Sequence, residues 1–236
     1  MPASLVVTCE HAGNKIPGRY RPLFSPHARL LTTHRGFDPG ALDLARELAA
    51  CFRAPLYFTK VSRLLVDTNR SLGHRGLWSP IGRGLSAAEK ERVLAAYYHP
   101  FREAVRHEIA RALHAGGEIL HLSVHTFAPS LRGQVRHTDV GLLYDPGREL
   151  ERRLARAWAA ALARERPGLR VRFNSPYRGR ADGHVTALRR VFPPERYVGL
   201  ELEVNQRFLR PRPSAWVQLR QALGRSLVVA LQALRR

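Results

Sequence analysis

Leu5-Val6-Val7-Thr8 runs directly into Cys9-Glu10-His11-Ala12-Gly13-Asn14, so a short apolar segment stops at acidic, imidazole and glycine residues. A β-branched run of this length is typical of a buried strand. In open α/β sheets ligands bind at the carboxyl ends of the strands, and Glu10 and His11 would lie at such an end. One turn of this kind is more often a solvated loop, so its interpretation depends on how the later strands end.

Strand-like and helix-like segments alternate along the rest of the chain. Further strands are predicted over 56–59, 118–124, 139–144, 169–173 and 197–204, and residues 61–66 extend or follow the first of these. Helices are predicted to begin at residues 41 and 213 and to span residues 148–165 and 184–191. A longer helix is predicted from the capping box at 86–89 to the glycines at 116–117. Residues 14–34 form a long, partly ordered connection, and 71–85 form a loop over the site.

This alternation predicts an α/β fold with a mainly parallel, mixed sheet covered on both sides by helices. The chain has 236 residues, a length at which α/β proteins are often single domains, so we expect one domain over residues 1–236.

The composition is that of an ordinary globular protein. Hydrophobic residues make up 44% of the chain, and no run approaches the roughly 18 apolar residues that a membrane span needs. The start, Met1-Pro2-Ala3-Ser4, has no basic region followed by an apolar segment, so we expect a cytoplasmic protein without membrane contact. Cys9 and Cys51 are too few for a disulfide framework and have no spacing for a thiolate zinc site.

The net charge of +20 raises the possibility of a nucleic acid or another polyanion as partner. Only Lys15, Lys60 and Lys90 are lysines, and the arginines are spread along the chain without a basic arm. Solvated, arginine-rich helix faces explain this pattern better, so nucleic acid is an unlikely partner. A positive field would still help to attract a small anionic substrate. No feature of the sequence predicts an oligomeric state.

Polar residues at the predicted strand ends could meet at one edge of the sheet. They are His11, Asp38 near the next turn, Asn69-Arg70, His125 and Glu203. Two imidazoles and one carboxylate form a three-ligand set suited to catalytic zinc, which leaves a fourth position for water. Glu203 could take a proton from that water and return it to a leaving nitrogen, while arginines hold a substrate carboxylate.

Each of these residues could instead have a purely structural role. His11 and His125 could be hydrogen-bonded histidines, Asp38 an N-cap, Arg70 an ion pair and Glu203 the partner of an arginine. The complete set is harder to explain in that way. Seven other histidines have no spacing that links them to this set: His27, His74, His99, His107, His114, His121 and His137.

Seven blocks, in the same order, carry a resemblance to a known family. They are Cys9–Asn14 with Ile16-Pro17, Gly36–Ala41, Ser62–Arg70, Ser123–Phe127, Asp139–Tyr144, Asn174–Tyr177 and Gly199–Gln206. In these blocks the chain resembles the N-formylglutamate amidohydrolases and is distantly similar to the zinc carboxypeptidases and aspartoacylase. The resemblance covers nearly the whole chain.

The resemblance implies a three-layer α/β/α sandwich of phosphorylase/hydrolase type and zinc-dependent hydrolysis of an N-formyl or other N-acyl amino acid, most simply N-formyl-L-glutamate. It implies one Zn²⁺ per chain, with His11, Asp38 and His125 as ligands and Glu203 as general base. Arg63 resembles the arginine that polarises the scissile carbonyl, and Asn69-Arg70 the pair that binds a substrate carboxylate. Glu10 could bind the metal in place of Asp38, because an acidic ligand lies close to the first histidine in the distant relatives.

Two alternatives remain at this point. The chain could be a polyanion-binding protein on an inactive hydrolase scaffold, or it could hydrolyse another N-acyl or γ-glutamyl substrate. The acyl pocket would be formed by loops 71–85, 127–138 and 174–184. Arginines in the last two loops, which could bind a dicarboxylate or be solvated surface charges, are Arg132, Arg136, Arg178 and Arg180.

Overall fold

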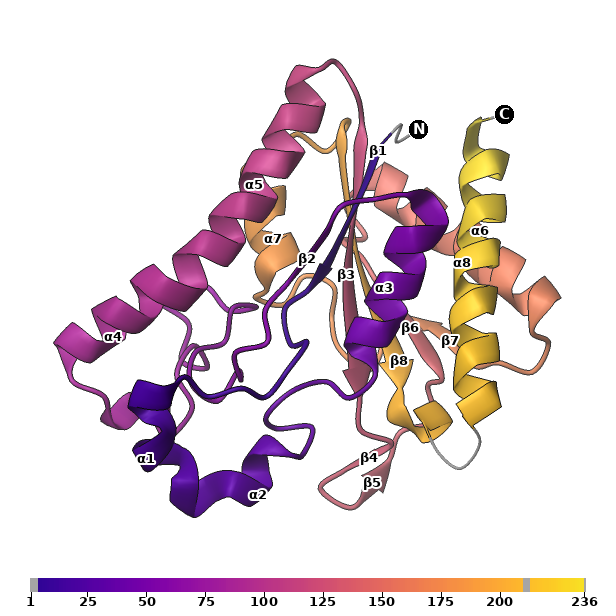
Figure 1. Cartoon of the computed structure of the whole chain (residues 1–236). Coiled ribbons are helices and arrows are strands. Elements are labelled where there is room, and N and C mark those ends of the chain that lie inside the picture. The colour runs from indigo at the N-terminus through magenta and orange to yellow at the C-terminus, as the bar shows by residue number, and fades with distance from the viewer. Residues whose placement is uncertain (1–3, 210–212, 236) are drawn as a thin grey trace.

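A six-stranded sheet forms the centre of the protein in the computed structural model, which describes residues 4–209 and 213–235 (Figure 1). Its strands are β1 (Ser4–Cys9), β2 (Leu56–Phe58), β3 (Ile119–Phe127), β6 (Val140–Leu143), β7 (Val171–Phe173) and β8 (Tyr197–Asn205). They lie in the order β2-β1-β3-β8-β6-β7. The first four are parallel, whereas β6 is antiparallel to β8 and parallel to β7. The mainly parallel, mixed sheet predicted from the sequence is therefore confirmed.

Helices cover both faces of this sheet, and others lie beside it (Figure 1). They are α1 (Arg21–Phe24), α2 (Ala28–Leu31), α3 (Ala41–Phe52), α4 (Ala87–Val93), α5 (His99–His114), α6 (Glu149–Glu165), α7 (His184–Arg189) and α8 (Pro213–Arg235). α3, α6 and α8 pack on one face, and α5 and α7 on the other. No helix within the described ranges is long and apolar enough to cross a membrane.

Spacing in the sequence explains how the helices pack. In α5 the residues Val105, Ile109 and Leu113 follow one another at intervals of four, so they share one face of the helix. All three are buried, in a cluster with Val6 of β1 and Ile119 of β3. The apolar stripe of α5 thus attaches this helix to the sheet.

The two faces of the central strands differ in polarity. Side chains alternate along a strand, and Leu120, Leu122 and Val124 of β3 enter the large apolar core beneath α3, α6 and α8. The opposite face carries a buried row of polar side chains, which we call the polar face. Its members are Thr8, His121, Ser123, His125, Glu201 and Glu203. Parallel pairing aligns these side chains, because Thr8 is paired with Ser123, and His125 with Glu203.

Three segments differ from the expectation. Residues 61–66 are not a strand: after one bridge at Val61 the chain turns, and Leu65 enters a second apolar cluster. The 14–34 connection contains α1, α2 and the short 3-10 turns Gly18–Tyr20 and Ser25–His27. The long helix after residue 86 is interrupted by a π-helical segment, Leu94–Tyr98. That segment lies just before Pro100, which has no N–H to donate to the preceding turn.

The remaining elements lie at the periphery. A small hairpin pairs β4 (Ser130–Leu131) with β5 (Gln134–Val135), and both strands are exposed. Two further 3-10 turns, Gly82–Gly84 and Gln206–Leu209, precede α4 and follow β8.

Candidate active site

A cavity of about 150 Å³ opens where β1, β3 and β8 approach their carboxyl ends. It is lined by His11, Asp38, Arg63, Asn69, Arg70, His125, Thr126, Tyr177, Arg178, Ala181, Asp182, Glu201 and Glu203. Every site residue expected from the sequence except Glu10 is in this set. Residues separated by almost 200 positions are thus brought together by the parallel order of the strands.

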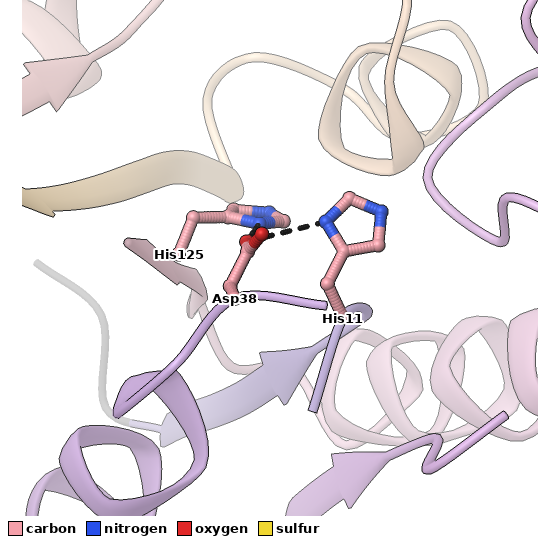
Figure 2. Close-up of side chains that lie close together, drawn as sticks. All are labelled: His11, Asp38 and His125. Atoms are coloured by element: carbon pink, nitrogen blue, oxygen red, sulfur yellow. Dashed lines mark hydrogen bonds and ion pairs between the residues drawn. The ribbon is translucent and has the colours of Figure 1, made fainter. Parts of the chain in front are cut away.

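His11, Asp38 and His125 form the centre of this cavity (Figure 2). One potential ligand atom from each lies within 4.8 Å of the others, and all three residues are buried. The Asp38 Oδ2 atom is 3.3 Å from Nδ1 of His11 and 2.9 Å from Nδ1 of His125. The same ring nitrogen of both histidines therefore faces one carboxylate oxygen.

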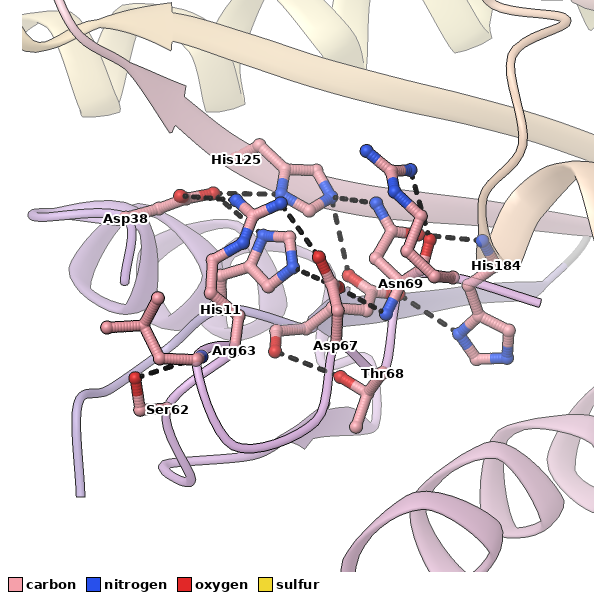
Figure 3. Close-up of polar contacts among 12 residues, drawn as sticks. His11, Asp38, Ser62, Arg63, Asp67, Thr68, Asn69, His125 and His184 are labelled. Carbon is pink, nitrogen blue, oxygen red and sulfur yellow. Dashed lines mark hydrogen bonds and ion pairs between the residues drawn. The ribbon is translucent and has the colours of Figure 1, made fainter. Parts of the chain in front are cut away.

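Asp67 fixes the orientation of the His11 ring (Figure 3). His11 Nε2 lies 2.7 Å from Asp67 Oδ1, and a carboxylate can only accept a hydrogen bond there. Although burial opposes ionisation, the guanidinium of Arg63 and the His11 ring hold the pKa of Asp67 well below its usual value. The ring hydrogen of neutral His11 is therefore on Nε2, and Nδ1 keeps its lone pair toward Asp38.

Glu10 lies on the other side of His125 from Asp38. Its Oε2 atom is 3.5 Å from Nε2 of His125, whereas Asp38 contacts Nδ1. Burial works against its ionisation, but the hydrogen bond from His184 and the imidazole of His125 lower the pKa of Glu10. Asp38 and not Glu10 is thus the carboxylate that faces both histidines.

The three facing atoms need a positive charge among them. A lone pair on each Nδ1 and a carboxylate oxygen are all acceptors, so their close approach is unfavourable without a proton or a metal ion. Burial lowers the pKa of His125, but the hydrogen bond and charge of Asp38 outweigh it and raise that pKa to about 10. Two imidazole nitrogens and one carboxylate also make up the ligand set of many catalytic zinc sites. The donor set therefore fits a divalent metal ion.

Asp38 does not cap the following helix. The residue before α3 is Gly40, at a φ of +79°, and no side chain caps this end. A positive φ strains residues with a side chain, so the glycine makes the turn between Pro39 and Ala41 possible. The Asp38 side chain is thereby left to contact the histidines.

Glu203 stands beside His125 on the neighbouring strand. The two residues are paired in register between β3 and β8, and both line the cavity. Burial raises the pKa of Glu203 to about 8. The carboxylates of Asp38 and Glu201 also raise this pKa, whereas the positive charge of His125 lowers it. Its Oε2 atom is buried and has no hydrogen-bond partner within the described residues. This is a carboxyl group that can exchange a proton near neutral pH.

Arg63 contacts two buried carboxylates, Asp38 and Asp67, which we call the acidic centre. One of its nitrogens, Nη2, donates to Asp67 Oδ2 at 2.8 Å, and Nη1 lies 3.6 Å from Asp38 Oδ1. A quarter of its side chain remains exposed toward the cavity. Arg63 can therefore contact a molecule that enters the site while its position stays fixed.

Asn69 and Arg70 also line the cavity. The Asn69 Oδ1 atom accepts from the backbone N–H of His184 at 2.7 Å, and Nη1 of Arg70 donates to the carbonyl oxygen of Asp182. Nε and Nη2 of Arg70 make no hydrogen bond within the described residues. A planar guanidinium held in this way is suited to a carboxylate.

Among the four loop arginines, Arg178 is the one that lines the cavity, and its guanidinium has no partner in the described part of the chain. Arg180 pairs with Asp145, and Arg136 donates to the Tyr177 hydroxyl. Arg178 is thus an exposed cation that lines the cavity and has no ion-pair partner among the described residues.

Sequence reasoning missed several residues of the site. Asp67 lies inside the Ser62–Arg70 block and Glu201 lies two residues before Glu203, but the sequence predicts a role for neither. His121 and Ser123 precede His125 at two-residue intervals, a spacing that places all three on the polar face. That spacing was the available signal, whereas the contact between Asp67 and His11 has none in the sequence.

Two known proteins are similar to this chain over most of its length. The chain is 28% identical over 233 residues to N-formylglutamate deformylase of Pseudomonas aeruginosa, a match that covers 86% of this chain and 80% of that protein. The structure of gene product Atu2144 from Agrobacterium tumefaciens has a TM-score of 0.85 at 29% identity and covers 100% of this chain and 93% of its own.

N-formylglutamate amidohydrolase from Ralstonia eutropha JMP134 has the same fold, with a TM-score of 0.74 at 21% identity and coverage of 100% and 97%. The family model described as FGase, N-formylglutamate amidohydrolase, matches residues 3–210. The chain therefore belongs to the N-formylglutamate amidohydrolase family.

Proposed function

We propose that this protein is a zinc-dependent amidohydrolase that cleaves the formyl amide of N-formyl-L-glutamate to glutamate and formate. The catalytic domain would span residues 1–236 and hold one zinc ion. The observation that carries the proposal is the meeting of His11, Asp38 and His125 beside a carboxyl group with a raised pKa. Family membership supports the reaction class.

His11 and His125 would bind the metal through their Nδ1 atoms and Asp38 through its carboxylate. When bound, a zinc ion supplies Lewis acidity, which polarises a carbonyl group and lowers the pKa of water to about 7. The cavity lies on the open side of these three residues, so substrate can reach the metal.

Glu203 would act as the general base. Its unpartnered Oε2 atom accepts a proton from the attacking water and then donates it to the leaving amine nitrogen. Arg63 would stabilise the negative charge that develops on the carbonyl oxygen, because its guanidinium lies at the edge of the acidic centre.

Three groups would bind the two carboxylates of the substrate. Asn69 and Arg70 contact the α-carboxylate, and the free guanidinium of Arg178 contacts the side-chain carboxylate. A dicarboxylate is favoured over a monocarboxylate because the guanidinium of Arg178 lines the cavity and makes no ion pair within the described residues.

Glu203→Gln tests the mechanism directly. The substitution keeps the size of the side chain but removes the base, so formate release should fall about 10²- to 10⁴-fold. Zinc content, measured by elemental analysis, should remain at one ion per chain because Glu203 is not a ligand. A variant that hydrolyses N-formyl-L-glutamate at the wild-type rate would show that Glu203 is not the base.

A second variant tests the ligands. His125→Ala should lose the tightly bound metal, since it removes one of three ligands. If the purified variant keeps one tightly bound equivalent of zinc, His125 is not a ligand.

A further inference from the structure

Glu10 is a buried carboxylate that the mechanism above leaves without a role. Its side chain is fully buried and receives three hydrogen bonds. Thr8 Oγ1 donates to Oε1 at 2.8 Å, and Ser123 Oγ donates to Oε2 at 2.8 Å. His184 Nδ1 lies 3.1 Å from Oε1 and must be the donor there, because an ionised carboxylate only accepts. Glu10 thus receives hydrogens on both oxygens.

The hydrogen bond from Ser123 decides which nitrogen of His125 carries a hydrogen. A serine hydroxyl has a single hydrogen, and Ser123 gives it to Glu10. Ser123 Oγ also lies 2.9 Å from Nε2 of His125, so in this second contact it must be the acceptor. The hydrogen is therefore on Nε2 of His125.

The amide of Asn69 gives the competing contact. Its Nδ2 atom lies 3.4 Å from the same Nε2, and it could donate only to a ring nitrogen without hydrogen. The contact to Ser123 is shorter by half an ångström, and the Glu10 carboxylate leaves Ser123 no other arrangement. The Asn69 contact is therefore not a hydrogen bond in this arrangement.

The opposite nitrogen of His125 is the one in the candidate metal site. Nδ1 lies 2.9 Å from Asp38 Oδ2, and only a nitrogen without hydrogen can bind a metal. For His11 the same result follows from its direct contact with the Asp67 carboxylate. For His125 the carboxylate of Glu10 acts through the Ser123 hydroxyl.

We propose that Glu10 is a positioning residue that keeps the hydrogen of His125 on Nε2, through Ser123, and so leaves Nδ1 free for the metal. This proposal rests on the metal site proposed above. It gives Glu10 a role different from that of a ligand.

Further hydrogen bonds at Oε1, the oxygen that Ser123 does not contact, hold the Glu10 carboxylate in place. Thr8 donates its only hydrogen to Glu10 and therefore accepts from Nε2 of His121, 2.9 Å away. His121 Nδ1 in turn accepts from the Tyr197 hydroxyl at 2.7 Å. Burial and the neighbouring His184 lower the pKa of His121 to about 3, so this ring stays neutral. Each hydrogen bond in the series from Tyr197 through His121 and Thr8 is thus donated toward Glu10.

Glu10→Gln is expected to reverse the last part of this chain. The glutamine oxygen replaces Oε1, where Thr8 and His184 both donate, and the amide NH₂ faces Ser123. Ser123 then accepts from the amide and turns its own hydrogen to Nε2 of His125. That leaves the ring hydrogen on Nδ1, and the Asn69 amide can add a second donor to Nε2.

Ser123→Ala is the matched control. It removes the Ser123–His125 hydrogen bond, which Glu10→Gln only reverses, yet it keeps the Glu10 carboxylate 3.5 Å from Nε2 as an acceptor. Nε2 should therefore keep its hydrogen. If the role of these residues were only to hold the ring in place, Ser123→Ala would lose at least as much zinc affinity as Glu10→Gln, because only Ser123→Ala loses the hydrogen bond to the ring.

The experiment measures zinc affinity by competition with a chelator for wild type, Glu10→Gln and Ser123→Ala. Loss of an outer-shell partner typically weakens binding about 10- to 100-fold, and we expect this for Glu10→Gln against less than about tenfold for Ser123→Ala. Equal affinities of the two variants, or an unchanged Glu10→Gln, would overturn the proposal. Failure of the wild type to bind zinc would instead overturn the metal site itself.

A measurement on the wild type covers the case in which Glu10→Gln does not fold. In ¹⁵N NMR spectra of the metal-free protein, recorded at a pH at which the His125 ring carries a single hydrogen, that hydrogen should be on Nε2. A hydrogen on Nδ1 would contradict the proposal.

Discussion

At the scale of single residues, the site depends on which atoms can donate a hydrogen. Asp67 acts on His11 directly, and Ser123 links Glu10 to His125, so that both Nδ1 atoms face Asp38. Five buried carboxylates contribute to this region: Glu10, Asp38, Asp67, Glu201 and Glu203. A divalent cation at the centre would offset part of this negative charge.

Arg178 is the residue expected to select for a substrate with a side-chain carboxylate. Hydrogen bonds to charged groups contribute about 1.5–3 kcal/mol, so Arg178→Gln should lower kcat/KM for N-formyl-L-glutamate about 10- to 100-fold. Its kcat/KM for N-formyl-L-glutamine, which lacks that charge, should change less than about threefold. Steady-state kinetics with both substrates measure the difference.

Arg180→Gln is the control for this prediction. Arg180 lies two residues further on, pairs with Asp145 and does not line the cavity. It should leave both substrates unaffected. Parallel losses for both substrates in Arg178→Gln would mean that Arg178 does not contact the side-chain carboxylate.

The sequence predicted the residue types of the site better than their contacts. His11, His125 and Glu203 could be selected because each lies at or near the end of an apolar run, and Asp38 because it lies just before a predicted helix. The choice between Asp38 and Glu10 could not be made, because it depends on which side of the His125 ring each carboxylate approaches. That geometry arises only when β1 and β3 pair.

At the scale of elements, a buried ion pair joins α7 to α6 and β8. Arg189 Nε donates to Glu151 Oε1 at 3.0 Å, and Nη2 donates to the carbonyl oxygen of Gly199 at 2.8 Å. The side chains of both residues are at most 5% exposed. This contact positions α7, whose first residue is His184.

Arg189→Met should therefore be strongly destabilising. Removing one partner of a buried pair leaves an unpaired charge, which typically costs about 3–5 kcal/mol. Urea unfolding of metal-free protein measures the change in the free energy of unfolding. Arg152→Met, which breaks the exposed Arg152–Glu149 pair, should cost less than about 1 kcal/mol. Similar losses in the two variants would contradict the structural role of Arg189.

Most elements were predictable because their hydrophobic periods are clear. α6 and β8 lie close to their expected ranges, and α5 forms the last part of the helix expected from residue 86. Residues 61–66 were less predictable, since the run Leu64-Leu65-Val66 is apolar in a strand and in a buried turn alike. The antiparallel direction of β6 depends on pairing with β8, which is more than 50 residues away in the sequence.

At the scale of the whole molecule, a basic protein surrounds an acidic centre. The net charge is +20, whereas buried carboxylates gather at the candidate site. A positive field outside favours the approach of an anionic substrate. The acidic centre favours a metal cation, so the two regions of opposite charge serve different ligands.

Zinc titration of the metal-free protein tests the central claim most directly. The protein is stripped with a chelator, its residual metal is measured, and formate release from N-formyl-L-glutamate is followed as zinc is added back. The account predicts negligible activity without metal, a linear rise with added zinc and a plateau at one equivalent per chain. Full activity in protein shown to contain no metal would contradict it.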